Sequence, residues 1–510
     1  MKKNILIYAL KGTGWIGGVY YIKNLLYQLS VSPEAAYKYK YYIYADQVAE
    51  EEFEEFIEIM HMHVVTPDGS REQILAVCDD YDIDVVLPVI GGGYTWLIRD
   101  ICLYWIPDFQ EIHFPENFTL ESIEDRRITR GYIAKEHKSL ILSSQDSYRD
   151  YRMQYPENTE NVFVVHFVSY ISHLIEQMTE TYESNILQKN KIAYDYIFVA
   201  NQFWRHKNHV VLLRAMDELV NRRGREIHLV CTGFMQSYGQ RDAYVESLYQ
   251  YIEEHRLQNY IHFLGLLERK EQLCLMKNAR LLIQPSKFEG WGCSVEDAKV
   301  MGKNMLLSDI GVHREQQYAK SILFPQDDSS VLAKLIMENF EGAEKYDLTY
   351  GSRYTMEKAR QYSLELQNAI DAMGVKESGD YLKKLNRCRK EKVLQLFGGL
   401  PSDQICIWGV GWQTEQILKI CRQIWTDISF VYSDADETKW GTDFNQGKVY
   451  PPSQLSELGI RRIIICDTEN QEIVYQSIKA FEKDVEIVGL YHSDREKNEP
   501  LWMRENSVMK

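Results

Sequence analysis

Paired cysteines, an excess of basic residues and long apolar runs are all missing from this 510-residue chain. Its nine cysteines are scattered and include no C-x-x-C pair, which favours reduced thiols and offers no ligand set for structural zinc. The net charge of −16 lacks the basic excess that nucleic-acid binding requires. Because no run of about 18 apolar residues occurs, we predict no transmembrane helix.

We also predict no signal peptide, because the first apolar run, residues 4–10, is short and is broken by Gly12. We therefore interpret that run as a first β-strand and expect a cytoplasmic protein. Internal repeats and low-complexity tracts are absent as well. The remaining composition, 45% hydrophobic and 26% charged, is that of an ordinary globular chain. At roughly 150 residues per domain, the length predicts about three domains.

Apolar runs alternate with helical patterns, and this alternation starts three times along the chain. Repeated β–α alternation is typical of a doubly wound parallel sheet. We predict domains at 1–190, 191–350 and 401–510, a helical segment at 351–373 that ends the unit formed by the first two domains, and a charged, helical-looking linker at 374–400. The predicted strands are 4–10, 40–44, 63–65, 83–90, 103–109, 140–143, 161–166, 196–199, 227–232, 260–264, 279–284, 304–308, 321–324, 405–408, 428–432, 462–466 and 485–491.

The stretch Pro285–Lys303 is the strongest candidate site, because a glycine loop follows a buried strand and runs into a helix start. Ser294 followed three residues later by Asp297 predicts a capping box, which leaves Asp297 a purely structural alternative. Glu289 is different, since a charge between an apolar strand and two glycines has little structural purpose. The glycines also interrupt any helical pairing of Glu289 with Glu296.

A basic cluster, Asn201–His209, also lies between a predicted strand and a predicted helix. Arg205 and Lys207 can converge there with the helix dipole on an anion such as phosphate. The alternative is a solvated polar cap. The two histidines lack a third ligand at suitable spacing, so we predict no metal site here.

The N-terminal glycines, Gly12-x-Gly14-x-x-Gly17, match the dinucleotide-binding fingerprint. They resemble those of the nucleotide-sugar epimerases and reductases, but a plain tight turn would use them equally well. Enzymes of that kind need a Tyr-x-x-x-Lys pair, in which lysine lowers the pKa of a tyrosine base. Such pairs occur only outside the first domain, at Tyr354/Lys358 and Tyr475/Lys479.

Taken together, residues 1 to about 372 resemble the family 4 retaining glycosyltransferases of the GT-B fold. Phe288–Gly302 is similar to that family's E-x7-E signature, with Glu289 first and Asp297 where the second glutamate usually stands. Asn201–His209 resembles its phosphate-binding segment, with Lys207 as the lysine. This chain departs from the pattern at Gln202, where the family has arginine, so Arg205 is the substitute we expect. Further similar segments are Gly17-Gly18, Trp105–Gln110 with His113, and Ser308–Glu315.

The resemblance implies a GT-B fold of two Rossmann-like domains facing a cleft. It implies a nucleotide-sugar donor on the second domain, a glycan or lipid-linked acceptor, peripheral membrane association at the inner face, and neither cofactor nor metal. Stabilising the charge that develops on a leaving diphosphate would supply most of the catalysis. The implied catalytic residues are Glu289, Arg205 and Lys207. The implied donor-binding residues are Asp297, Glu296, Gly290, Gly233 and Ser294, and the acceptor-side residues are Gly17, Gly18, Asp108, Gln110 and His113.

The third unit lies outside this resemblance. Its Gly409-Val-Gly411 turn, with Thr414 and Asp434 further on, resembles the small Rossmann-like N-domains of sugar O-acyltransferases. That resemblance implies a nucleotide-sugar ligand, but docking or a purely architectural role explains the unit equally well. The sequence therefore favours a retaining glycosyltransferase of polysaccharide or O-antigen assembly. The alternatives are an NAD-dependent epimerase or reductase and a non-enzymatic nucleotide-sugar-binding scaffold.

Overall fold

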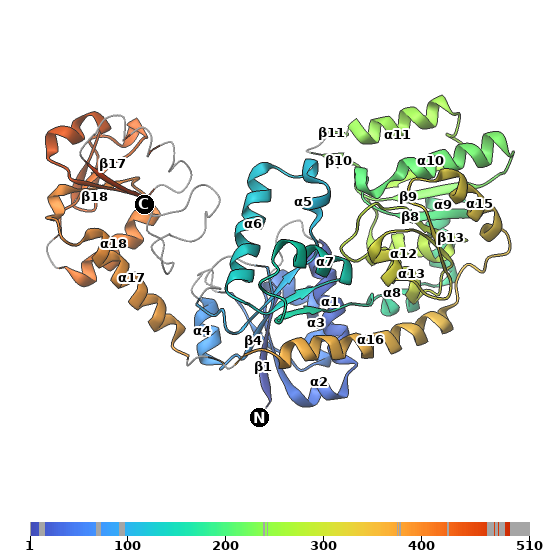
Figure 1. The fold of residues 1–510 in the computed structure, drawn as a ribbon, viewed down its shortest axis with the longest axis horizontal. Coiled ribbons are helices and arrows are strands. Elements are labelled where there is room, and N and C mark those ends of the chain that lie inside the picture. Colours follow the sequence, from blue (N-terminus) through green and yellow to red (C-terminus); the bar gives the residue numbers. More distant parts are fainter. Residues whose placement is uncertain are drawn as a thin grey trace.

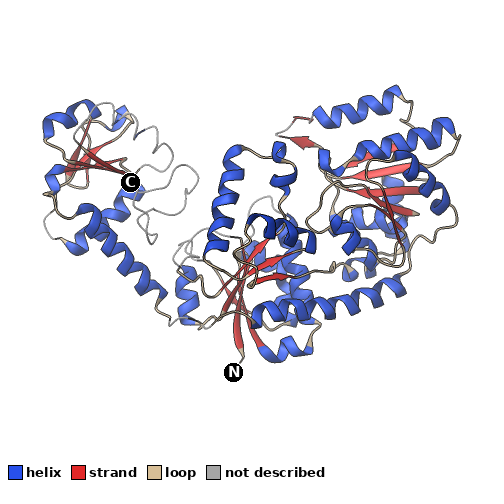
Figure 2. Cartoon of the chain, in the orientation of Figure 1, coloured by secondary structure: helices blue, strands red, loops and turns tan. Residues whose placement is uncertain are grey.

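The computed structural model describes residues 2–9, 16–67, 73–90, 97–237, 240–241, 243–374, 376, 379–425, 428–466, 474, 478 and 485–489. Three α/β units follow one another along the chain (Figure 1), and helices cover both faces of the first two sheets (Figure 2). The fold class predicted from the sequence is confirmed: two Rossmann-like domains and a third, smaller sheet domain.

The first domain contains a seven-stranded, all-parallel sheet in the order β3-β2-β1-β4-β5-β6-β7. Apolar side chains alternate between the two buried faces of its strands: Leu6 packs on one face, and Ile5 and Ile7 on the other. The strands are β1 (Lys3–Tyr8), β2 (Tyr39–Tyr44), β3 (His63–Val65), β4 (Val85–Val89), β5 (Cys102–Ile106), β6 (Leu140–Leu142) and β7 (Val162–Val164). The helices are α1 (Ile16–Ser30), α2 (Pro33–Lys38), α3 (Gln47–Ile59), α4 (Gln73–Asp80), α5 (Gln110–His113), η1 (Pro115–Asn117), α6 (Leu120–Lys135) and α7 (Gln145–Gln154).

The second domain contains a six-stranded parallel sheet in the order β12-β9-β8-β13-β14-β15. Its strands are β8 (Tyr196–Ala200), β9 (His228–Thr232), β12 (Ile261–Gly265), β13 (Leu281–Gln284), β14 (Met305–Ser308) and β15 (Ser321–Phe324), with a small hairpin of β10 (Gln236–Ser237) and β11 (Gln240–Arg241). Its helices are α8 (Ser172–Glu176), α9 (Glu180–Lys189), η2 (Arg205–Lys207), α10 (His209–Asp217), η3 (Glu218–Arg222), α11 (Ala243–Glu254), α12 (Arg269–Asn278), α13 (Cys293–Val300), α14 (Gly311–Glu315) and α15 (Ser329–Phe340).

The chain crosses between these domains twice. Helices α8 and α9 pack against α12 of the second domain, on the N-terminal side of the boundary expected at residue 190. Helix α16 (Leu348–Asp371) then returns from α13 to α1 (Figure 1). Near its end, Asp371 accepts hydrogen bonds from the Lys38 ammonium at 2.8 Å and the Tyr39 hydroxyl at 2.9 Å. The two crossings join the domains at neighbouring points.

The segment expected to be a linker contains α17 (Tyr381–Phe397), a helix that contacts both α4 and α18. Its Tyr381 and Leu385 are buried in the core that it shares with the first domain. The third sheet has the order β18-β19-β17-β16-β20-β21. Its elements are η4 (Ser402–Gln404), β16 (Ile405–Trp408), α18 (Trp412–Ile424), β17 (Val431–Ser433), η5 (Glu437–Lys439), β18 (Asp443–Phe444), β19 (Gly447–Tyr450), η6 (Pro452–Leu458), β20 (Arg462–Ile465) and β21 (Glu486–Gly489).

Within the part of the chain that the structure describes, no helix is long and apolar enough to span a membrane.

Candidate functional site

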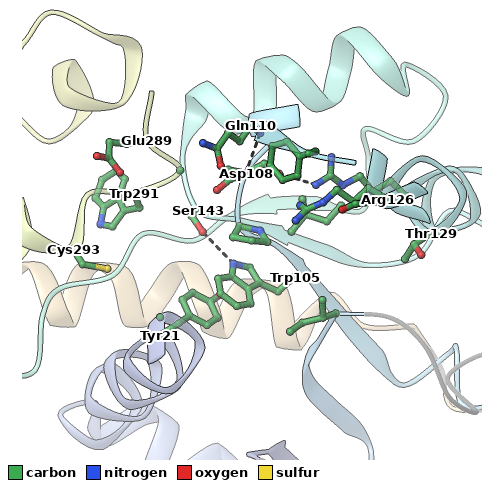
Figure 3. A pocket seen from close by; sticks show the side chains of 18 of the residues that line it. Tyr21, Trp105, Asp108, Gln110, Arg126, Thr129, Ser143, Glu289, Trp291 and Cys293 are labelled. Carbon is green, nitrogen blue, oxygen red and sulfur yellow. Dashed lines mark hydrogen bonds between the residues drawn. The ribbon is translucent and has the colours of Figure 1, made fainter. Parts of the chain in front are cut away.

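A cavity of about 740 Å³ opens between the first two domains. The first domain contributes the end of β5 and one face of α6, and the second contributes Trp204 and the loop from Glu289 to Cys293 (Figure 3). In the first domain this position is the carboxyl end of a parallel strand, where open α/β sheets bind their ligands. The cavity is lined by Gly17, Tyr21, Ile90, Trp105, Ile106, Pro107, Asp108, Gln110, Phe118, Ser122, Asp125, Arg126, Thr129, Arg130, Ser143, Phe167, Trp204, Glu289, Gly290, Trp291 and Cys293.

The loop between β13 and α13 forms the second-domain wall of this cavity. Strand β13 is buried throughout, and the loop that follows it reaches the cavity lining five residues later, at Glu289. The capping box predicted for Ser294 and Asp297 is wrong. Helix α13 begins at Cys293, which puts Ser294 inside its first turn, and the residue before the helix is Gly292 without a side-chain cap. The Ser294 hydroxyl instead donates to Oε1 of Gln284 at 3.2 Å.

Glu289 projects from this loop toward the cavity (Figure 3). Its Oε1 accepts hydrogen bonds from Nζ of Lys207 at 2.7 Å and from Nε2 of Gln284 at 2.9 Å. Burial by itself would raise the pKa of Glu289, but the Lys207 ammonium outweighs it and the pKa falls to about 2. The side chain is therefore a fixed carboxylate at neutral pH.

The two basic side chains of the segment Asn201–His209, Arg205 and Lys207, contact different partners. Lys207, in η2, reaches Glu289, and the residue after it, Asn208, adopts a left-handed conformation with φ of 56°. The Asn208 side chain donates to the backbone carbonyls of Pro285 at 3.2 Å and Gln326 at 2.8 Å, which holds this turn beside the loop. Arg205 is exposed, lies over the Tyr244 ring and does not line the cavity. The structure thus joins Lys207, but not Arg205, to Glu289.

The two acidic residues of α13 have different partners. Asp297 is 1% exposed and accepts from Nη2 of Arg269 at 2.6 Å and from the Ser169 hydroxyl. Glu296 is 2% exposed and is held by Nζ of Lys299 and by Nε2 of Gln316, both at 2.8 Å. Of these two carboxylates, Asp297 is the one hydrogen-bonded to Ser169, which lies in the segment that leads from β7 into the second domain.

Two glycines of the expected donor side lie where the backbone is crowded. Gly233 has φ of 151°, and a Cβ there would lie 1.9 Å from the carbonyl oxygen of Asn201. A Cβ on Gly290 would lie 2.6 Å from the carbonyl oxygen of Pro107, across the cleft. The loop therefore touches the first domain, and only glycine permits so close an approach.

On the acceptor side, Asp108 and Gln110 line the cavity. Burial raises the pKa of Asp108, whose Oδ1 accepts from the backbone N–H of Gln110 at 3.1 Å. The Gln110 amide reaches the His206 ring across the cleft, with Nε2 to Nδ1 at 2.9 Å. Burial, together with the Lys207 charge, lowers the pKa of His206 to about 4, so this ring is neutral. His113 lies outside the lining and pairs with Asp150 at 2.8 Å.

The remaining predictions, for the N-terminal glycines and the Tyr-x-x-x-Lys pairs, have different outcomes. Gly17 lines the cavity, whereas Gly18 is buried in α1. Gly12 and Gly14 lie outside the described residues, as do Tyr475 and Lys479. Tyr354 and Lys358 lie on α16, where burial raises the pKa of Tyr354 above its ordinary value. A tyrosine base would need the opposite shift, so this pair does not support epimerase chemistry.

Sequence reasoning placed Trp105 and Trp204 inside two candidate segments, but it assigned no role to the aromatic side chains of the cavity. The Tyr21 ring stacks on Trp105 with centroids 3.5 Å apart, and the Trp105 indole N–H donates to the Ser143 hydroxyl at 3.1 Å. Phe118 and Trp204 line the same space. Tyr21, Phe118 and Trp204 follow predicted strands, whereas Trp105 lies within the predicted strand 103–109. An aromatic residue at any of these positions equally predicts core. Nothing in the pattern distinguishes the two roles.

In the third domain, Asp434 at the end of β17 is already engaged. Its Oδ2 accepts from the backbone N–H of Val410 at 2.8 Å and from Nζ of Lys439 at 2.9 Å. The Thr414 hydroxyl donates to the backbone carbonyl of Gly409. These contacts fix the glycine turn, and they assign no ligand to it.

Two Rossmann-like domains that face a shared cleft are the arrangement of the GT-B class of fold. Glu289 lines this cleft, and Lys207 holds it from behind the lining. Residues 183–349 match the family of glycosyl transferases group 1. That match covers the second domain, including Lys207 and Glu289. No curated protein sequence matches the chain.

Solved structures agree on the fold. A glycosyltransferase from Rickettsia africae has a TM-score of 0.50 and 14% identity, covering 72% of this chain and 96% of its own. HepE from Anabaena, solved with UDP and glucose, has a TM-score of 0.50 and 19% identity, covering 72% and 100%. Sucrose-phosphate synthase from Thermosynechococcus elongatus has a TM-score of 0.50 and 14% identity, covering 72% and 98%. At these identities the likeness establishes the fold.

Proposed function

We propose that this chain is a retaining glycosyltransferase of family 4 that moves a sugar from a nucleotide-sugar donor to a glycan or lipid-linked acceptor. The reaction would serve polysaccharide or O-antigen assembly, without a metal or a cofactor, in the cytoplasm or peripherally at the inner face of the membrane. The observation that carries the proposal is the Lys207–Glu289 pair at 2.7 Å in a cleft between two domains. The match to glycosyl transferases group 1 over residues 183–349 supports it.

The geometry suggests how the pair would work. Lys207 is a partly exposed ammonium that can share its protons between Glu289 and a phosphate oxygen. A leaving diphosphate gains negative charge as the glycosidic bond breaks, and a fixed cation at that place lowers the barrier. Glu289, ionised at neutral pH, can accept hydrogen bonds from donor-sugar hydroxyls and orient the ring. Asp297 is the carboxylate we assign to the ribose, which requires it to exchange its contact with Arg269 or Ser169 for one with the donor.

The cleft also suits a transfer reaction. Asp108 and Gln110 face Glu289 from the first domain, so an acceptor bound there would meet the donor sugar across the cavity. Aromatic rings such as Trp105 and Trp204 provide flat apolar surfaces, and the apolar faces of sugar rings can stack on them. Closing the domains over both substrates excludes water, which suppresses hydrolysis of the donor. A soluble analogue of the acceptor should therefore increase turnover of the donor.

The first test is a thermal-shift panel of UDP-, GDP- and ADP-sugars with NAD and NADP. A ligand that binds only the native state raises the unfolding temperature. We expect a rise with one nucleotide-sugar class, followed by nucleoside-diphosphate release when acceptor is added. Stabilisation by NAD alone would instead favour the epimerase or reductase alternative, and binding without turnover would favour the scaffold. The anomeric configuration of the product, read by NMR, decides whether the enzyme retains it.

The second test is Glu289→Gln. The amide keeps the size of the side chain but removes the charge that pairs with Lys207, so we expect transfer to fall by roughly 100-fold or more. The matched control is Glu341→Gln, since Glu341 is exposed and lies at the end of α15, outside the cavity lining. Equal transfer rates in both variants would refute the site assignment.

A further inference from the structure

The first crossing between the domains, residues 165–171, is built into the first domain. We call this segment the crossover. The Gln28 amide donates to the backbone carbonyl of His166 at 3.0 Å, and the backbone N–H of Tyr170 donates to Oδ1 of Asn24 at 2.9 Å. Both partners lie on α1. The backbone of the crossover is therefore fixed relative to the first sheet.

The same crossover also contacts the second domain at two places, the loop between β13 and α13 and the helix α13 that follows it. The Trp291 indole N–H donates to the backbone carbonyl of Phe167 at 3.0 Å, and the Ser169 hydroxyl donates to Oδ1 of Asp297. Trp291 stands two residues after Glu289, and Asp297 lies on the helix that follows. Asp297 is therefore hydrogen-bonded to the crossover directly. Glu289 is connected to the crossover through its near neighbour Trp291.

His166 lies near the start of the crossover and contacts three separate elements. Its Nδ1 lies 3.0 Å from Oε2 of Glu365 on α16, and its Nε2 lies 3.4 Å from Oε2 of Glu315 on α14. Its ring packs against Trp291 with centroids 4.8 Å apart, and against Tyr362 at 5.1 Å. Burial would lower the pKa of His166, but the two carboxylates raise it to about 9, so the ring is a cation at neutral pH.

Glu315 extends this contact to a fourth element. It accepts hydrogen bonds from the backbone N–H groups of Gln145 at 2.7 Å and Asp146 at 2.8 Å, in the first turn of α7. A second-domain carboxylate thus caps a first-domain helix, the position where the helix dipole favours an anion. The approach is tight, because a Cβ on Gly311 would lie 2.0 Å from Oδ1 of Asp146.

We propose that His166 and Glu315 form an interdomain latch, in which the α7 cap and the His166 ring fix the loop carrying Glu289 relative to the first domain. The rate effect of the latch rests on the proposed function, whereas the latch itself does not. His166 and Glu315 do not line the cavity and act through Trp291 and the crossover, so they are positioning residues. When the latch opens, Glu289 and Trp291 move away from Asp108 together, because they belong to one short loop.

The test compares His166→Gln and Glu315→Gln with the control His255→Gln. His255 also pairs with a carboxylate, Asp217 at 3.1 Å, but within the second domain and away from the cleft. Hydrogen exchange without substrate is measured over residues 289–295 and over the first turn of α7. We expect protection in both segments to fall by about tenfold or more in the two latch variants and to stay unchanged in the control. Unchanged protection in both latch variants would overturn the proposal.

Kinetics then separate positioning from a merely structural role. Because small misplacements of catalytic groups cost up to about 100-fold in rate, we expect kcat to fall about tenfold or more while the donor KM changes less than about threefold. Lost protection with an unchanged kcat would overturn the positioning role. If the wild-type protein transferred no sugar, the proposed function would fail instead, and the exchange comparison would still decide whether the latch exists.

Discussion

A buried carboxylate beside a single lysine is the residue-scale feature on which the site depends. Burial alone would favour the neutral acid of Glu289, and the Lys207 ammonium 2.7 Å away is the largest of the interactions that keep it charged. Breaking such a pair leaves an uncompensated buried charge, which is far more costly than losing a surface ion pair. The two side chains therefore depend on each other for stability as well as for chemistry.

Lys207→Met tests this dependence. Removing the cation should cost roughly 3 kcal/mol of unfolding free energy at pH 7 and raise the pKa of Glu289. In the wild type, whose Glu289 pKa is depressed to about 2, the contribution of this carboxyl is present above its unfolded value, about 4.5, and is lost as the pH falls toward 2. In the variant, the pH dependence of this contribution has the opposite sign. The raised pKa lets Glu289 take up a proton as the pH falls, and protonation removes the cost of burying its charge.

Denaturant unfolding at pH 7 and pH 5 measures both effects. We expect the gap between Lys207→Met and the wild type to narrow at pH 5. Lys287→Met is the control, because Lys287 pairs with the exposed Asp327 and its loss should be nearly neutral. A gap of equal size at both pH values would contradict the charge argument.

Residue types predicted part of this site. Glu289 was identifiable because a charge stood between a buried strand and two glycines, and Lys207 because it preceded a helix. The capping box failed because it depended on where α13 begins, and helix starts shift by one or two residues without a strong sequence signal. The direction of Arg205 was beyond prediction, since it is set by the Tyr244 ring on a helix about 40 residues later in the chain.

At the scale of elements, the positions of the strands along the chain followed from apolar runs bounded by glycine and polar residues. Both faces of a parallel sheet are buried, so its strands form continuous apolar segments, as in β4 and β13. The role of α17 could not be predicted in this way. Its charged sequence suggests a solvated linker, yet Tyr381, Leu385, Val393 and Phe397 form a stripe that is buried against two domains.

Helix α6, which supplies one wall of the cavity, contains a glycine that its structure does not require. Gly131 has ordinary helical φ, and a Cβ there would meet nothing within 4 Å. Gly131→Ala should therefore raise the unfolding free energy by about 0.5–1 kcal/mol, the usual difference between the two residues inside a helix. Thermal unfolding measures the gain, and a loss of stability would mean that α6 bends at this residue.

At the scale of the whole molecule, the two domains touch at Gly290. Gly290→Ala would place a methyl group 2.6 Å from the Pro107 carbonyl oxygen and 2.9 Å from Cβ of Asp108, so the cleft must widen. Because reacting groups must be held closely, we expect transfer to fall by roughly tenfold or more while each domain remains folded. The control is Gly374→Ala, where a Cβ meets nothing within 4 Å.

Small-angle scattering and a transfer assay together test this expectation. The Gly290→Ala protein should have a larger radius of gyration than the wild type, with a similar unfolding temperature. Full transfer activity in this variant would show that the approach of the loop to Pro107 has no part in the reaction. The family resemblance implied two facing domains, but it contained no information on this contact, which joins residues about 180 positions apart.

The closeness of Gly290 to Pro107 and the bridge from Gln110 to His206 have a kinetic consequence. Together they cover the loop that would hold the donor sugar, so the donor has to enter while the cleft is open and the acceptor follows into the first-domain side. We therefore expect an ordered sequential mechanism with the nucleotide sugar as first substrate and the nucleoside diphosphate as last product. The diphosphate would then inhibit competitively against the donor and non-competitively against the acceptor. A random order, with neither substrate required first, would mean that the covered loop exchanges ligands without the domains parting.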